Sequence, residues 1–127
     1  MALQPVADVM RDLATVGGGT YEQGTYLPFT PKDGFAVAFN GGVKATVGQV
    51  TLGWLERWLK AVPTEFEASF VGTWADGDTH DLSTVVYLDA VRYIRNRDEA
   101  IAFGVAQRQL AIWDFAAGES ITLPQEA

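Results

Sequence analysis

The chain has 127 residues, no cysteine and a net charge of −7. This length suits one domain, and 48% apolar against 20% charged residues exclude a disordered chain. Without cysteine there are no disulfides, thiolate metal sites or cysteine nucleophiles. No apolar run approaches the roughly 20 residues of a membrane helix, and residues 1–5 lack the features of a secretory signal. We therefore expect a cytoplasmic protein without a membrane partner.

The excess negative charge lies in the second half of the chain. Residues 1–63 contain five acidic and five basic side chains, whereas residues 64–127 contain eleven acidic and four basic ones. Nucleic acid would meet a repulsive field, so direct binding of nucleic acid is not expected. A basic partner remains open.

The first half of the chain predicts one helix and three strands. Apolar residues at helical spacing predict a helix over 5–15, and β-forming residues predict a strand over 21–27. Apolar residues alternate over 35–39, and the Asn40-Gly41 pair that follows is a strong signal for a hairpin turn. Residues 43–47 would then form the returning strand.

Two helices and four strands follow from residue 51 onward. Thr51 can cap a helix over 51–62, and strands are predicted over 66–74 and 84–94. Asn96 can cap a third helix that reaches Arg108, and the chain closes with a hairpin formed by residues 110–115 and 120–123.

The element order α-β-β-β-α-β-β-α-β-β predicts a single α+β domain over residues 1–127. We expect a largely antiparallel or mixed sheet of about six or seven strands, with three helices on one face. The strand, helix and strand of residues 84–115 could add one parallel crossover.

The densest polar cluster comprises Asp76, Asp78, His80 and Asp81. Oxygen ligands at this spacing can hold a divalent cation, so a metal-dependent or small-ligand-binding protein or enzyme built on this loop is the alternative function. The cluster lacks the following glycine and distant glutamate of a calcium-binding loop, and no glycine-flanked serine accompanies His80. A solvated loop explains the pattern better, so we expect no metal, cofactor or catalytic residue here.

The second predicted helix is apolar over about half of its circumference, whereas a surface helix needs only about 100° of apolar stripe. Trp54, Trp58 and Ala61 lie in this apolar half. They are either core residues or a partner-binding surface, because tryptophan is enriched at binding hot spots. Trp74 and Trp113 are interpreted as structural.

Three segments of the C-terminal third resemble uncharacterised accessory proteins of actinobacteria and their phages: residues 87–91, 96–104 and 109–114. The shared motifs are structural. The resemblance implies a phage or mobile-element context, and it carries no activity and no functional residues.

These observations favour a non-enzymatic interaction protein that binds a host or self protein. With the resemblance, the hypothesis becomes an accessory, phage-encoded protein that modulates host functions or defence. A third hypothesis is a homo-oligomer closed through the tryptophan helix or the edge of the final hairpin.

Overall fold

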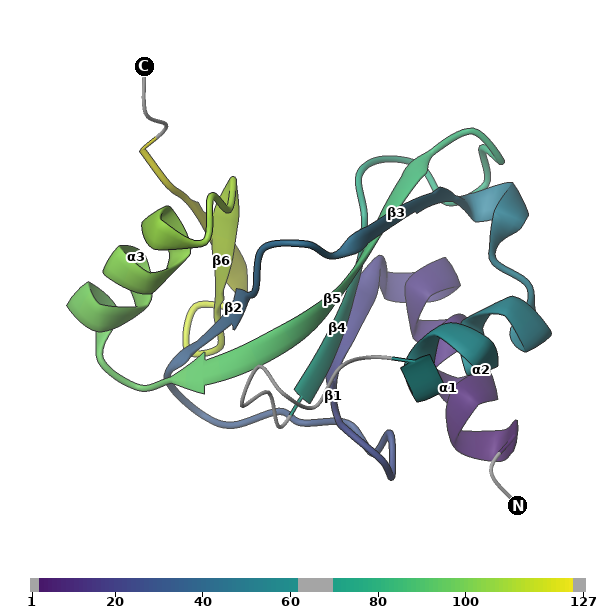
Figure 1. Cartoon of the computed structure of the whole chain (residues 1–127), viewed down its shortest axis with the longest axis horizontal. Helices are drawn as coiled ribbons and strands as arrows, with labels where there is room; N and C mark the ends of the chain where they lie inside the picture. Colours follow the sequence, from purple (N-terminus) through teal and green to yellow (C-terminus); the bar gives the residue numbers. More distant parts are fainter. Residues whose placement is uncertain (1–2, 62–69, 125–127) are drawn as a thin grey trace.

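The computed structural model describes residues 3–61 and 70–124. They form three α-helices and seven strands, in the order α1 (Leu3–Val16), β1 (Gly18–Glu22), β2 (Phe35–Ala38), β3 (Val43–Thr46), a 3₁₀ turn (Val47–Gln49), α2 (Leu52–Ala61), β4 (Phe70–Ala75), β5 (Val85–Ile94), α3 (Arg97–Ala106), β6 (Ala111–Asp114) and β7 (Glu119–Thr122) (Figure 1). The predicted α+β class and element order are confirmed. The predicted start of the fourth strand, at Phe66, lies outside the described residues. No helix in the described ranges is long and apolar enough to span a membrane.

All seven strands belong to one sheet. Six of them follow the order β1-β4-β5-β2-β6-β7, β3 pairs with β5 off this path, and every pairing is antiparallel. The ten-residue strand β5 is its centre. β4 pairs with one edge of β5. β2 and β3 pair with different stretches of the other edge. α3 connects β5 to β6, which run in the same direction with β2 between them. The crossover between parallel strands therefore passes over one intervening strand.

The hairpin predicted at Asn40-Gly41 is wrong. β2 and β3 are both antiparallel to β5, so they run in the same direction, and the chain does not turn back between them. Ala38 lies opposite Val91 and Val43 lies opposite Leu88, so four residues of this segment face two residues of β5. The Asn-Gly pair therefore lies in a bulge between two strand segments laid end to end.

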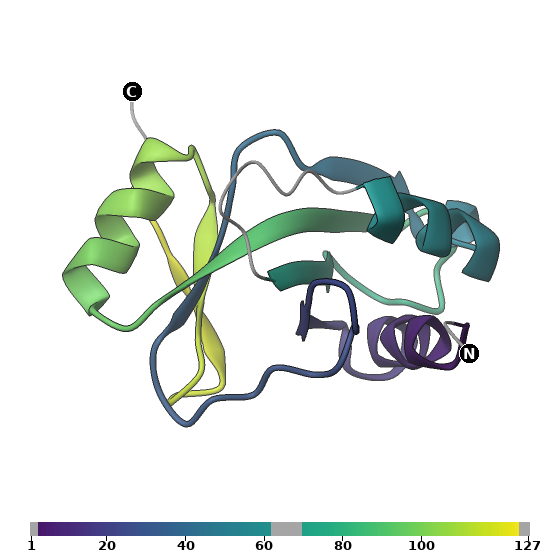
Figure 2. The ribbon, with the colours of Figure 1, turned by 60° about the horizontal axis from the view of Figure 1, so that its bottom comes forward.

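All three helices cover the same face of the sheet. α1 and α2 lie together at one end of the molecule and α3 lies at the other (Figures 1 and 2). Val86 and Leu88 of β5 belong to the apolar core beneath α1 and α2, and Ile94 belongs to a second core beneath α3. These even-numbered residues point to one side because strand side chains alternate. The odd-numbered side chains of β5 therefore lie on a face without helices.

The two predicted helix caps are present. The Thr51 hydroxyl accepts a hydrogen bond from the Trp54 backbone N–H at 3.2 Å. The Asn96 side chain accepts one from the Glu99 backbone N–H at 3.0 Å. Each bond satisfies a donor that the first turn of a helix leaves unpaired, which fixes where α2 and α3 begin.

Candidate binding groove

The helix-free face of the sheet contains a cavity of about 950 Å³, which we call the open-face groove. Residues of β2, β4 and β5 on the side of the sheet away from the helices form its floor: Ala36, Ala38, Gly72, Asp89 and Val91. A cavity of this size is typical of sites that enclose a small ligand or an inserted side chain.

Two glycines lie beside Asp89, and neighbouring side chains pack directly against their backbone. Gly72 lies opposite Asp89 on β4, and a Cβ atom there would lie 2.8 Å from Cγ2 of Val91. On the other side, a Cβ atom on Gly42 of the bulge would collide with the Asp89 carboxylate. The bulge that replaces the predicted hairpin therefore helps to shape the groove.

Aromatic rings form the walls of the groove. Trp74 of β4 stacks on Tyr87 of β5, with ring centroids 5.6 Å apart, and Nζ of Lys44 lies 5.5 Å from the Tyr87 centroid. Trp113 belongs to β6, which is separated from β4 by β5 and β2, and it lines the opposite side of the groove. Trp74 is 45% exposed and Trp113 is 40% exposed. Large rings with this much accessible surface can pack against a partner or ligand.

An aromatic cluster covers the helix-free face at one end of the groove, and its members Phe29 and Phe115 also line the groove. Phe29 comes from the long connection between β1 and β2, which runs past the sheet toward the α3 end (Figure 2). Its ring lies 4.1 Å from Phe70, 5.1 Å from Tyr93 and 5.8 Å from Phe115, measured between centroids. These contacts anchor the connection against the helix-free face.

Asp89 is the one acidic residue that lines the groove in the described part of the chain. Burial raises the pKa of its carboxyl from 3.8 to about 6. We find no hydrogen bond or ion pair to this carboxylate among the described residues. Asp89 is therefore ionised at neutral pH, and its charge is partly withdrawn from water with no compensating partner in the described part of the chain.

The described lining of the groove holds few groups that could act as acid or base. A carboxyl that titrates near pH 6 can exchange protons under physiological conditions, and such groups gather at functional sites. His80, the sole histidine of the chain, does not line the groove. Asp89 therefore has neither a histidine nor a second carboxyl beside it in the described lining. Its negative charge can attract a cation without help from another acidic side chain.

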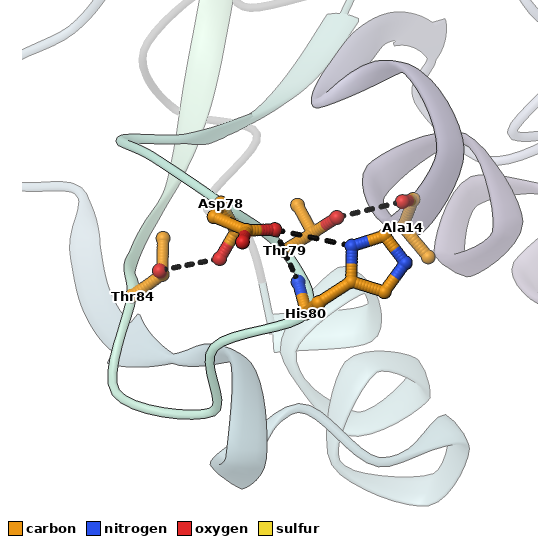
Figure 3. A network of polar contacts seen from close by, with 5 residues as sticks. All are labelled: Ala14, Asp78, Thr79, His80 and Thr84. Carbon is orange, nitrogen blue, oxygen red and sulfur yellow. Dashed lines mark hydrogen bonds and ion pairs between the residues drawn. The ribbon is translucent and has the colours of Figure 1, made fainter.

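The loop between β4 and β5 satisfies its own polar groups (Figure 3). The Asp78 carboxylate accepts the His80 backbone N–H at 2.9 Å and lies 3.1 Å from Nδ1 of the His80 ring. The Thr79 hydroxyl donates to the Ala14 carbonyl of α1 at 2.8 Å, and the Thr84 hydroxyl donates to the Asp78 carbonyl at 2.6 Å. These bonds shape the loop and dock it against α1.

The four residues predicted as an acidic loop lie on the exposed connection between β4 and β5. Asp76, Asp78, His80 and Asp81 are all exposed, and the Asp81 carboxylate accepts bonds from the Ser83 N–H and hydroxyl. Within the described ranges, no three acidic or histidine side chains stand close enough to hold a metal ion together. The geometry thus gives no support to the metal-dependent alternative.

The predicted partner-binding residues of α2 lie at the edge of the core. Trp54 and Trp58 are partly buried and pack against the core beneath α1 and α2. Ala61 is exposed. Part of each indole is thus engaged in packing, which reduces the surface that α2 can offer to a partner.

The expectation that Trp74 and Trp113 are structural is not met, because both are among the exposed large apolar residues. The sequence does contain a signal for this. Val71 and Ala75 alternate with Trp74 along β4, so both faces of the strand are apolar although helices cover only one of them. A charged residue, Asp89, inside the apolar strand β5 is a second signal.

No family model matches the chain, and no curated protein or solved structure shows significant similarity to it. The case for a function therefore rests on the groove itself.

Proposed function

We propose that this chain is a non-enzymatic interaction protein that binds a segment of another protein in the open-face groove. The observation that carries the proposal is the pair of exposed tryptophans, Trp74 and Trp113, on opposite sides of a floor of small residues. Binding energy at protein interfaces concentrates in a few aromatic side chains at the centre of a desolvated patch. A hollow floor between such rings admits a side chain from the partner.

The charge distribution supports a partner with basic character. The chain carries a net charge of −7, and residues 64–127, which include β4 to β7, account for all of it. Such a field speeds the approach of a basic surface and opposes nucleic acid. It also opposes a second copy of the same chain, so a different protein is the occupant that we propose.

The test is a selection of peptides, from a displayed random library, on the purified full chain. Wild-type protein should enrich a defined set of sequences. The double variant Trp74→Ala with Trp113→Ala should lose them, because the variant removes both walls of the groove. A second double variant, Trp54→Ala with Trp58→Ala, is the matched control, since it removes the same kind of side chain from α2.

Each outcome of the selection is informative once circular dichroism has shown that the variants are folded. Loss of the enriched peptides with the groove variant alone supports the proposal. Loss with the α2 variant alone moves the binding surface to α2 and overturns the groove as the site. Failure of the wild-type chain to enrich any peptide, or a dimer in light scattering that the groove variant dissolves, also overturns it.

A further inference from the structure

We infer that the open-face groove takes a cationic side chain of the partner, an arginine or lysine, whose charged group meets the Asp89 carboxylate between the rings of Trp74, Tyr87 and Trp113. This inference rests on the proposed function and specifies the side chain that the groove recognises. It is carried by the position of Asp89, by the faces of the rings and by the net charge of the chain.

Two neighbours of Asp89 carry no side chain that could pair with its carboxylate. Its cross-strand neighbour on β4 is Gly72, and the bulge contributes Gly42 beside the carboxylate, so neither neighbour has a side chain that covers it. No described residue offers the carboxylate a hydrogen bond or an ion pair. A guanidinium or ammonium group placed there would compensate a charge that the fold has partly removed from water.

The ring faces suit the same chemistry. Cations are attracted to the faces of tryptophan and tyrosine rings within about 6 Å of the centroid. The chain already shows this geometry with its own side chains: Lys44 lies over Tyr87 at 5.5 Å, and on the helix side Arg92 lies over Phe103 at 5.1 Å. A cationic side chain of the partner would make a cation–π contact of this kind and, in addition, an ion pair with Asp89.

Two basic residues of the chain also line the groove, Lys44 from β3 and Arg108 from the segment after α3. Both are exposed, so their charges are well hydrated. β4 contributes Gly72, Thr73, Trp74 and Ala75 to the lining, none of which carries a charge, and the other titratable group on β5 at the groove is Tyr87. Asp89 is thus the group whose ionisation sets the pH dependence of cation binding.

The experiment follows the four tryptophan indole N–H signals of the chain by NMR, after selective ¹⁵N labelling and assignment with single Trp→Phe variants. The probes are capped Gly-X-Gly tripeptides in which X is arginine, lysine, leucine or glutamate. The arginine and lysine probes should shift the signals of Trp74 and Trp113 and leave those of Trp54 and Trp58 unchanged. The leucine and glutamate probes should bind at least about tenfold more weakly.

Variants and pH supply the second part of the test. Asp89→Asn should weaken the arginine probe at least about tenfold, whereas Asp76→Asn, which neutralises an exposed carboxylate outside the groove, should leave its affinity unchanged. At pH 5, one unit below the Asp89 pKa of about 6, about a tenth of the carboxyl is ionised. The arginine probe should therefore bind about tenfold more weakly at pH 5 than at pH 7.

The possible failures are distinguishable. If leucine binds as well as arginine, or if Asp89→Asn has no effect, the groove is an apolar site; the inference is then overturned and the proposed function survives. If the arginine and lysine probes leave Trp74 and Trp113 unchanged, the inference is overturned whatever the peptide selection shows. If they shift Trp54 and Trp58 instead, both proposals are overturned.

Discussion

Replacing Asp89 with asparagine should make the folded protein more stable at neutral pH. The pKa of the Asp89 carboxyl rises from 3.8 to about 6 because burial disfavours its ionised form. The folded state therefore binds a proton more tightly than the unfolded state does. In the wild type, this group lowers the free energy of unfolding as the pH rises from about 4 to about 6, and the full penalty applies above that range.

The size of the effect follows from the same two values. A pKa difference from 3.8 to about 6 corresponds to about 3 kcal/mol at neutral pH, and this is an upper bound because the asparagine amide is itself partly desolvated. We expect Asp89→Asn to raise the free energy of unfolding by about 1 to 3 kcal/mol at pH 7. For a domain of this size, the melting temperature should rise by about 4 °C per kcal/mol.

Thermal and urea unfolding at several pH values would measure the gain. It should be largest at pH 7 and should disappear near pH 4, where the wild-type carboxyl is protonated in the folded state. Asp76→Asn is the control, since this exposed carboxylate should change stability by less than about 0.5 kcal/mol. A variant that is less stable than the wild type at pH 7, or a gain that does not depend on pH, would refute the placement of an uncompensated charge in the groove.

Four further substitutions test the fold that holds the groove. Leu55→Ala removes a fully buried side chain of α2 and should lower the urea unfolding free energy by about 3 kcal/mol; a loss below about 1 kcal/mol would contradict its place in the core. Gly18→Ala should lower the free energy of unfolding by more than about 2 kcal/mol in the same assay, because φ is +140° and the new Cβ would collide with the Thr73 carbonyl. Gly24→Ala, where φ is +98° and the Cβ would enter open space, should lower it by only about 1 kcal/mol. Equal losses for the two variants would be inconsistent with the contact between Gly18 and Thr73. Asn96→Ala removes the cap of α3 and should lower the melting temperature by an amount equivalent to about 1 kcal/mol; an unchanged melting temperature would show that the cap bond adds no stability.

Local signals in the sequence were sufficient for most of the fold. The caps at Thr51 and Asn96 mark the starts of α2 and α3, and alternation identifies β5. The Asn40-Gly41 pair led to a wrong hairpin prediction, because this signal indicates a local turn and does not determine which strand the next segment pairs with. The long edge of β5 pairs with both β2 and β3, so the chain continues in one direction through the bulge.

The groove was harder to predict than the fold. Strand alternation separates the side chains of β4 and β5 into two faces, but it does not say which face the helices cover. Both faces of β4 carry apolar residues, so the pattern alone does not show whether the face with Trp74 is buried. Trp74 is exposed because the helices, which are distant in sequence, pack on the other face. Asp89 was the available clue, since a charged residue in a central apolar strand breaks the local pattern and such breaks gather at functional sites.

The central claim is that partners bind in the open-face groove, and the most direct test is isothermal titration of an enriched peptide against three forms of the full chain. We expect Trp113→Ala to raise the dissociation constant at least about tenfold, which corresponds to about 1.4 kcal/mol, and Trp58→Ala to leave it unchanged. The opposite result, a loss with folded Trp58→Ala and none with Trp113→Ala, would contradict the account and place the binding surface on α2.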